Sequence, residues 1–273
     1  MKKRTIHVFT VFFVASALLM PLVFAATDAP AEFYVIAGSR GVGTEIKSLP
    51  YTISSSGFYY ITKNLSCGPE SHGITIVGHN VTLDLMGFNL AGSGQGIYHG
   101  IYMNQKTNVE IRNGTVRNFP QDGIHEESVG TGHRIINIRT RNNGRRGIYF
   151  ASEGRNHIVK NCTAVGNASN GIDAAGSGST VTGNTCYNNA LSGIYAGNGS
   201  TVTGNNCSYN GDDGISAGSG STVIGNTCLY NTNYGIDLGG YNLVDQNTAY
   251  GNGTSMSNPT GCVFGTNVGA PSP

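Results

Sequence analysis

A short repeat from Gly123 to Asn252 constrains this chain more than any other feature. A Gly-Ile pair returns every 21 to 24 residues. A unit this short, rich in Gly and Asn, cannot enclose a hydrophobic core by itself and must stack on its neighbours. The repeat therefore predicts a solenoid. The pairs are Gly123-Ile124, Gly147-Ile148, Gly171-Ile172, Gly193-Ile194, Gly214-Ile215 and Gly235-Ile236.

A second marker lies between these pairs and consists of two Asn residues with four residues between them. One coil departs from this spacing, because Asn161 and Asn167 carry one extra residue. Asn tolerates a left-handed backbone, and its amide can bond to the next Asn in a stack. Both Asn columns are therefore expected in turns. The regular pairs are Asn113/Asn118, Asn137/Asn142, Asn184/Asn189, Asn205/Asn210, Asn226/Asn231 and Asn247/Asn252.

The apolar residues of each unit alternate, as Ile194 and Ala196 do, which is the period of a strand. Twenty-one residues cannot contain two helices and their loops, so helical repeats are excluded. A coil of three short strands fits, and stacking places like residues in columns. One interior column is predicted to hold the six Ile residues of the Gly-Ile pairs. A second is predicted to hold Ile158, Val181, Val202, Val223 and Val244.

Three units of the chain resemble the repeats of bacterial parallel β-helix proteins of the pectate-lyase-like superfold. They are GSGSTVTGNTCYNN, GNGSTVTGNNCSYN and GSGSTVIGNTCLYN, and GITIVGHNVTLDLMGFNLAG resembles the entry coil of the same exported group. The resemblance covers roughly residues 50–260. It implies an all-β, right-handed parallel β-helix of about eight to nine coils. The superfold includes lyases, glycosidases, epimerases and adhesins, so the resemblance does not specify one activity.

The ends of the chain differ from the repeat. Residues 1–25 combine a basic start, an apolar run and small residues at the end, which predicts a cleaved signal peptide and an exported protein, periplasmic or extracellular. No later stretch approaches the roughly 20 apolar residues of a membrane helix. Residues 26–70 are predicted to form an N-terminal cap and the first strands, 71–264 the β-helix, and 265–273 a loose tail.

Cysteines in an exported protein suggest disulfides, but their spacing argues against them here. Cys186, Cys207 and Cys228 recur every 21 residues and should form one column. Residues stacked on parallel strands point the same way, whereas a disulfide needs Cβ atoms turned toward each other. We therefore predict a ladder of packed thiols, with Cys67 and Cys262 too far apart to pair. No His accompanies the ladder, so no metal site is predicted there.

Charge is distributed unevenly along the chain. Without the signal peptide 13 Lys and Arg remain against 15 Asp and Glu, and nine of these 13 basic residues lie between Arg112 and Lys160. A near-neutral exported protein is a poor candidate for nucleic-acid binding. The basic centre favours anionic ligands, although plain solubility explains it equally well.

Acidic, basic and aromatic residues converge on neighbouring coils in this basic region. The residues after each Ile should point outward, and the residues before each Gly lie beside them. These two columns bring together the candidate catalytic residues His125, Arg146, Tyr149, Asp122 and Asp173. The candidate substrate-binding residues around them are Tyr102, Glu127, Arg145 and Tyr195.

Two chemistries fit this set. A polyuronate lyase needs a cation, here Arg146, to neutralise the uronate carboxylate, and His125 or Tyr149 to move the C5 proton. A glycoside hydrolase would instead use paired carboxylates, Asp122 with Asp173 or Glu127. The alternative is an ordinary solvated face.

Other motifs are weaker. Asp212-Asp213 is similar to the adjacent-Asp element of polygalacturonases, but the other signatures of that family and of pectate lyases are missing. Acidic residues beyond Asn161 could bind Ca²⁺, but they are spread over several coils, so no cofactor is predicted.

The sequence therefore leaves two hypotheses for function. In the first, the protein binds, and in an enzymatic version cleaves, a polysaccharide or cell-surface glycan, with an acidic glycan favoured. In the second, it is a non-catalytic surface or periplasmic scaffold that serves in adhesion.

Overall fold

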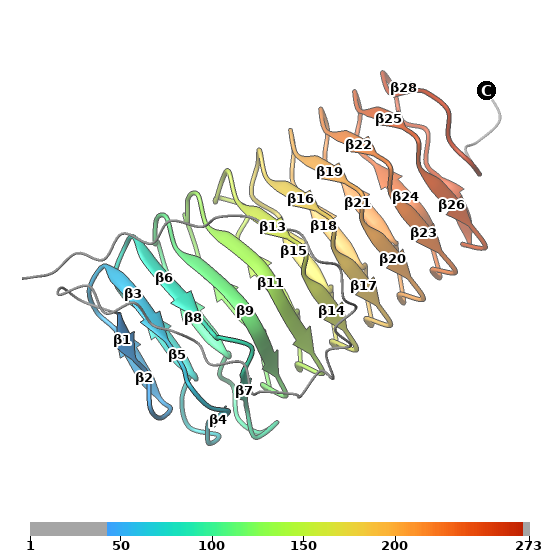
Figure 1. The fold of residues 1–273 in the computed structure, drawn as a ribbon. Helices are drawn as coiled ribbons and strands as arrows, with labels where there is room; N and C mark the ends of the chain where they lie inside the picture. The colour runs from blue at the N-terminus through green and yellow to red at the C-terminus, as the bar shows by residue number, and fades with distance from the viewer. Residues whose placement is uncertain (1–42, 270–273) are drawn as a thin grey trace, which may run out of the picture. The chain divides into compact units, whose positions relative to one another are not determined.

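The computed structural model describes residues 43–269, which all belong to one compact unit. The predicted signal peptide at residues 1–25 lies outside these residues. The described part consists of strands and turns, and it holds no helix long and apolar enough to cross a membrane. Figure 1 shows the coils stacked in sequence order from β1, in blue, to β28, in red.

One face of the stack is a parallel sheet of ten strands. Its ten rungs correspond to about nine turns of the chain, which confirms the predicted parallel β-helix and its length. In chain order the strands are β2 (Tyr51–Ile53), β5 (Ile74–Ile76), β8 (Ile101–Met103), β10 (Ile124–Glu126), β12 (Ile148–Phe150), β15 (Ile172–Ala174), β18 (Ile194–Ala196), β21 (Ile215–Ala217), β24 (Tyr234–Leu238) and β27 (Thr254–Met256).

An 18-stranded parallel sheet forms the other two faces as two rows. The eight-residue strands β9 (Glu110–Arg117) and β11 (Arg134–Arg141) pass through the corner and belong to both rows. The first row also holds β1 (Thr44–Glu45), β3 (Gly57–Tyr60), β6 (Val81–Asp84), β13 (Ile158–Lys160), β16 (Thr180–Thr182), β19 (Thr201–Thr203), β22 (Thr222–Ile224), β25 (Leu243–Asp245) and β28 (Val263–Phe264). The second holds β4 (Leu65–Ser66), β7 (Asn89–Ala91), β14 (Thr163–Val165), β17 (Thr185–Tyr187), β20 (Asn206–Ser208), β23 (Thr227–Leu229) and β26 (Thr248–Tyr250).

A Gly-Ile pair marks the start of the strands from β5 to β21 in the ten-stranded sheet and lies within β24. The six Ile residues stack in register and are fully buried, as predicted. Glycine precedes each because the coils approach closely there. A Cβ on Gly193 would lie 2.7 Å from the carbonyl oxygen of Gly214 and 2.8 Å from Nδ2 of Asn210. No larger residue fits at that position.

The second interior column was predicted wrongly at one position. Val181 pairs with Val159, not with Ile158, and Val159 is fully buried while Ile158 lies at the boundary. Two β-branched residues stand side by side here. A shift of one residue along a strand moves a side chain to the other face, so composition alone did not fix the register.

Asparagine residues occupy two kinds of adjacent column with different structural roles. The sequence pattern did not distinguish the two kinds. Asn113, Asn137 and Asn161 adopt a left-handed backbone, with φ between 53° and 57°. Asn184 and Asn205 instead follow glycines with positive φ, and their amides are buried and hydrogen-bonded along the stack. The predicted left-handed backbone and the predicted hydrogen bonds between stacked Asn side chains both occur, but in different residues.

The thiol ladder is confirmed. Cys186 is in register with Cys207 and Cys207 with Cys228, and all three side chains are fully buried and free. Cys67 and Cys262 are free as well. Burial raises the pKa of Cys207 well above that of an ordinary thiol, which keeps the thiol protonated.

The strands before residue 70 continue the sheets. β2 pairs with β5, β3 with β6 and β4 with β7, so the described residues of the predicted cap form the first coil. A cap formed by residues 26–42 stays a prediction, because those residues lie outside the described range. In the predicted tail, Asn267 Oδ1 accepts hydrogen bonds from the backbone amide and the side chain of Asn247.

A hydrogen-bonded Glu–His pair lies inside the stack. Glu126 is fully buried, and its Oε2 lies 3.0 Å from Nε2 of His133, also fully buried. Nδ1 of His133 accepts the amide of Val109, so the His133 proton is on Nε2 and points at Glu126. The backbone amide of Gln105 donates to the other Glu126 oxygen, Oε1, at 2.6 Å. The pair thus accepts the backbone amides of Gln105 and Val109 inside the fold, whereas the neighbouring Glu127 faces outward.

Candidate functional site

The outward positions of the ten-stranded sheet place the predicted residues in one column. His125 on β10 pairs with Tyr102 on β8 and with Tyr149 on β12. Tyr149 in turn pairs with Asp173 on β15, and Asp173 with Tyr195 on β18. Each is the middle residue of a three-residue strand whose outer two side chains are buried, so it points away from the core.

A second column runs beside the first, in the turn before each strand. Asp122 and Arg146 occupy it on consecutive coils, and the Arg146 amide donates to Oδ1 of Asp122 at 2.7 Å. The Asp122 side chain is fully buried. Its second oxygen, Oδ2, lies 2.6 Å from Nδ1 of His125. The turn thus fixes a carboxylate directly behind the imidazole of His125.

The charge state of Asp122 follows from its contacts. Burial works to raise its pKa, but the hydrogen bonds from His125 and from the Arg146 amide outweigh it, and the pKa of Asp122 lies below its usual value. Asp122 is therefore a carboxylate at neutral pH. It orients His125 with Nδ1 inward and Nε2 outward, where Nε2 lies 3.0 Å from Oε2 of the half-exposed Glu127.

Arg146 lies between two carboxylates and an aromatic ring. Its Nε is 2.8 Å from Oδ2 of Asp173, its Nη1 is 3.9 Å from Oδ2 of Asp122, and its guanidinium carbon lies 4.1 Å from the ring centre of Tyr149. The pair with Asp173 is close but poorly aligned. Neither Arg146 Nε nor Asp173 Oδ1 has an aligned hydrogen-bond partner. Nε is buried, but the Arg146 side chain is 21 % exposed, so the Nη groups are the donors that a further anionic group can reach.

Burial also shifts the pKa of the groups around Arg146. It raises the pKa of Asp173, and the charge of Arg146 only partly offsets this. It raises the pKa of Tyr149 as well, against the same positive charge. Tyr149 therefore holds its proton at neutral pH and can donate it.

Two histidines that were not predicted complete the cluster. The His99 ring stacks on His125 with ring centres 3.9 Å apart, and His72 stacks on His99 at 5.3 Å and on Tyr102 at 4.4 Å. Tyr98, in the loop between β7 and β8, packs edge-on against His72 at 5.1 Å and borders the cluster on that side.

Both extra histidines are held neutral. Nδ1 of His72 accepts the amide of His99 at 3.0 Å, and Nδ1 of His99 accepts the amide of Asp122 at 3.2 Å. A nitrogen that accepts a hydrogen bond carries no proton, so each ring has its proton on Nε2. Burial, followed by the charge of His125, lowers the pKa of His99 to about 3 and lowers that of His72.

A sequence signal for these histidines existed. His72 and His99 each stand directly before a Gly-Ile pair, in the column that continues as Asp122 and Arg146. Following that column two coils further toward the N-terminus would have found them. We refer to the assembled group as the His125 site; its members are His72, His99, Tyr102, Asp122, His125, Glu127, Arg146, Tyr149 and Asp173.

Three members offer potential metal ligands. One ligand atom from each of His99, Asp122 and His125 lies within 4.8 Å of the others. The rings of His99 and His125 are stacked, however, so their in-plane lone pairs run side by side. They do not converge on a common position where a metal ion could bind. Nδ1 of each ring is also already engaged in a hydrogen bond. This arrangement fits hydrogen bonding better than metal coordination.

The remaining predicted residues lie at the edge of the site. Tyr195 is two coils beyond Tyr149 and 40 % exposed. Arg145 is exposed on the turn beside Arg146, and its charge adds to the lowering of the His99 pKa.

Comparisons with known proteins agree with this architecture. The model of a family described as "Right handed beta helix region" matches residues 72–227 and 127–268. No curated protein sequence matches the chain.

Several solved structures share the fold at low identity. The periplasmic alginate epimerase AlgG is 14 % identical with a TM-score of 0.58, over 78 % of this chain and 69 % of that one. The A-module of the Azotobacter vinelandii mannuronan C-5 epimerase AlgE4 is 14 % identical with a TM-score of 0.54, over 85 % and 83 %. The pectate lyase Pel9A is 15 % identical with a TM-score of 0.54, over 77 % and 63 %. At these identities the likeness concerns the fold.

Proposed function

The chain belongs to the family of right-handed β-helix regions, and from this premise we propose that it binds an acidic polysaccharide and moves the C5 proton of a uronate unit at the His125 site. Export to the periplasm or the cell exterior is part of the proposal. The observation that carries it is the buried Asp122 carboxylate behind His125, one coil from a guanidinium with unused donors.

The chemistry follows from these positions. The C5 proton of a uronate is acidic enough to remove only when the adjacent carboxylate is neutralised, and Arg146 supplies that charge. Once the half-exposed Glu127 turns away and the Nε2 proton passes to solvent, His125 keeps its Nδ1–H donated to Asp122 and accepts the C5 proton at Nε2. Tyr149, which keeps its proton, is the acid on the neighbouring coil.

Two outcomes are open to the carbanion formed in this way. Elimination of the C4 substituent gives an unsaturated sugar and a cut chain, as in a lyase. Return of a proton to the opposite ring face gives the C5 epimer without a cut. Both begin with the same proton removal, so an exchange measurement detects either one.

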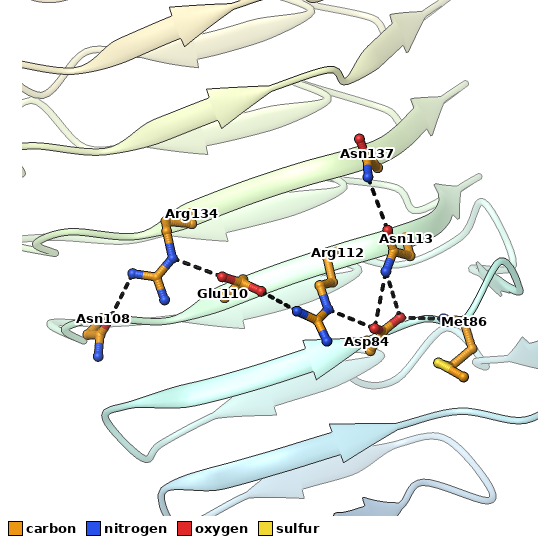
Figure 2. A network of polar contacts seen from close by, with 8 residues as sticks. All are labelled: Asp84, Met86, Asn108, Glu110, Arg112, Asn113, Arg134 and Asn137. Carbon is orange, nitrogen blue, oxygen red and sulfur yellow. Dashed lines mark hydrogen bonds and ion pairs between the residues drawn. The ribbon is translucent and has the colours of Figure 1, made fainter. Parts of the chain in front are cut away.

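The charges on the neighbouring face support an anionic substrate. Figure 2 shows Arg112 paired with Asp84 and Glu110, and Arg134 paired with Glu110. Farther along the same two strands, no carboxylate within residues 43–269 lies in ion-pair distance of the next arginines. A strip of uncompensated positive charge attracts polyanions from solution. Its members are Arg117, Arg139 and Arg141.

The known structures that share the fold support the choice of test substrates. Their names include alginate epimerases and a pectate lyase, which act on polyuronates. The non-catalytic alternative, a scaffold or adhesion protein, also has an observation in its favour. Three hollows of about 610, 410 and 240 Å³ are lined by residues outside the His125 site, and such hollows could hold a partner without catalysis.

The proposal is tested by incubating the purified protein with alginate, polygalacturonate and neutral glycans in D₂O. Deuterium entering C5 is followed by NMR, unsaturated products by absorbance at 235 nm, and new chain ends by a reducing-sugar assay. We expect C5 exchange on one polyuronate, with a loss of about 100-fold or more in His125→Ala and Arg146→Ala.

Arg155→Ala is the matched control, because Arg155 is exposed and lies on another turn. It should leave the exchange rate unchanged. Binding of polyuronate without exchange would overturn the catalytic part and leave the scaffold hypothesis. Absence of both binding and exchange would overturn the proposal as a whole.

A further inference from the structure

Four tyrosines form an exposed row on the C-terminal coils, away from the His125 site. Neighbouring ring centres are 5.5, 5.1 and 6.2 Å apart along the row Tyr187, Tyr209, Tyr230 and Tyr250. The four residues are between 45 and 64 % exposed. Large aromatic side chains left in water over several coils are unusual for a monomeric surface and often mark a binding site.

Two of these tyrosines occupy a backbone conformation that does not suit them. Tyr209 has a φ of 57° and Tyr230 a φ of 56°, the left-handed region that bulky residues avoid. The same turn position holds Asn142, Gly166 and Asn188 in earlier coils, which are residues that adopt this backbone readily. The fold alone therefore gives no reason for tyrosine at these two turns.

The ring of Tyr230 lies close to Gly251 of the next coil. A Cβ on Gly251 of the next coil would lie 2.6 Å from the Tyr230 ring, so only glycine leaves room for it. The ring lies between Gly251 and the ring of Tyr209, which stacks on it with ring centres 5.1 Å apart, so a ligand reaches it from its exposed side. Strained residues that persist in a structure are commonly part of a binding site.

A groove follows the same turns. It has a volume of about 610 Å³ and crosses several coils, with Asn142 and Asn188 among its lining residues and Tyr209, Tyr230 and Thr232 farther along. Its lining contains amides, hydroxyls, small side chains and the two tyrosine rings, but no Asp, Glu, Lys, Arg or His. We call it the tyrosine groove.

The chemistry of the lining defines the ligand. An uncharged groove with aromatic faces and amide edges matches a molecule that has apolar C–H faces and hydroxyl edges but no net charge. Sugar rings have this character. No Lys or Arg follows Lys160 in the sequence, so the C-terminal coils cannot compensate an anionic polymer. The tyrosine rings, one per coil from Tyr187 to Tyr250, present a repeating aromatic surface to a repeating chain.

We propose that the tyrosine groove binds a neutral polysaccharide chain, as a site separate from the His125 site. The exposed sides of Tyr209 and Tyr230 pack against sugar rings, and the exposed amides of Asn142 and Asn188 bond to hydroxyl groups. None of the groove's lining residues belongs to the His125 site, so the two sites can bind independently.

The test uses Tyr209→Asn and Tyr230→Asn, singly and together. Asn is the residue that Asn142 and Asn188 supply at this turn, so the variants should fold and gain about 2–4 °C in Tm. We measure binding to oligosaccharides and polymers of glucose, xylose and mannose, and to polygalacturonate, by affinity electrophoresis and calorimetry. Wild-type protein should bind at least one neutral glycan, and each substitution should weaken it roughly tenfold.

Tyr241→Asn is the matched control. Tyr241 is also in the left-handed region, with a φ of 62°, and it is 73 % exposed, but it does not line the groove. It should gain stability without losing binding. His125→Ala should bind neutral glycan as the wild type does, which separates this proposal from the one on the His125 site.

Three results would overturn the proposal. The first is that no neutral glycan binds. The second is that Tyr209→Asn and Tyr230→Asn lower the Tm and leave binding unchanged, which would make the tyrosines structural. The third is that the substitutions dissociate a dimer in sedimentation velocity, which would make a second copy of the chain the occupant.

Discussion

The buried Asn ladder supports a quantitative prediction about stability. Asn205 is 2 % exposed and its side chain makes four hydrogen bonds. Oδ1 accepts the amide and the side chain of Asn184 at 2.9 and 3.0 Å. Nδ2 donates to the carbonyl of Val181 and to Oδ1 of Asn226, both at 2.9 Å. One side chain thus connects three consecutive coils.

Asn205→Ala removes all four bonds and leaves the buried amide of Asn184 without its acceptor. At about 1 kcal/mol for each bond, and more for a buried group without a partner, the expected loss is roughly 3–5 kcal/mol. Asn206→Ala, one residue away, is the control. Asn206 is exposed and accepts one bond, from Ser208, so its loss should be about 0.5 kcal/mol.

A third variant isolates the donor side of the ladder. Asn205→Asp keeps an acceptor for Asn184 but turns a carboxylate oxygen toward the carbonyl of Val181 and Oδ1 of Asn226. A buried unpaired carboxylate has a raised pKa, so stability should return in part as the pH falls and the group is protonated.

The free energies of unfolding of all three variants are measured by urea unfolding, followed by far-UV circular dichroism at pH 7 and pH 4.5. Equal m-values would show that the same surface is exposed in each case, which matters in a solenoid whose coils can unfold separately. A difference below about 1 kcal/mol between the unfolding free energies of Asn205→Ala and Asn206→Ala would contradict this prediction, because the ladder would then add little to the backbone bonds of the sheets.

Three further predictions follow from burial. Burial raises the pKa of Asp213 to about 6 from 3.8, so its contribution to stability is complete below pH 3.8 and is lost as the pH rises through 6. The variant Asp213→Asn retains an acceptor for the backbone amide of Tyr234. In thermal unfolding it should raise the free energy of unfolding by about 1 kcal/mol at pH 8 and leave it unchanged at pH 3.5. Ile215→Ala should cost about 3 kcal/mol in urea unfolding, and a cost as small as that of the half-buried Ile224→Ala would contradict the interior column. In the folded protein Cys262 should react with a thiol reagent well before the fully buried Cys207, and simultaneous labelling would show that the ladder is open.

The architecture could be predicted from the amino-acid sequence because the fold is a solenoid. A solenoid repeats its unit, so every structural requirement recurs at the same period and is visible in one chain. The Gly-Ile pairs showed where coils approach closely and where the core begins. The same period placed Asp122, His125 and Arg146 on adjacent coils, because residues one period apart are neighbours in the stack.

Features that depend on a shift of one residue in strand register could not be predicted in this way and follow from the strand pairing. Ile158 and Val159 are equally apolar, and the pairing of β13 with β16 turned Val159 inward. Glu126 and Glu127 are chemically alike, yet strand alternation buried the first against His133 and left the second beside Nε2 of His125. His72 and His99 became members of the site through ring stacking and through the amides of the following coils. Periodicity fixes which coil a residue belongs to, whereas side-chain direction depends on local pairing, and the chemistry of the site depends on direction.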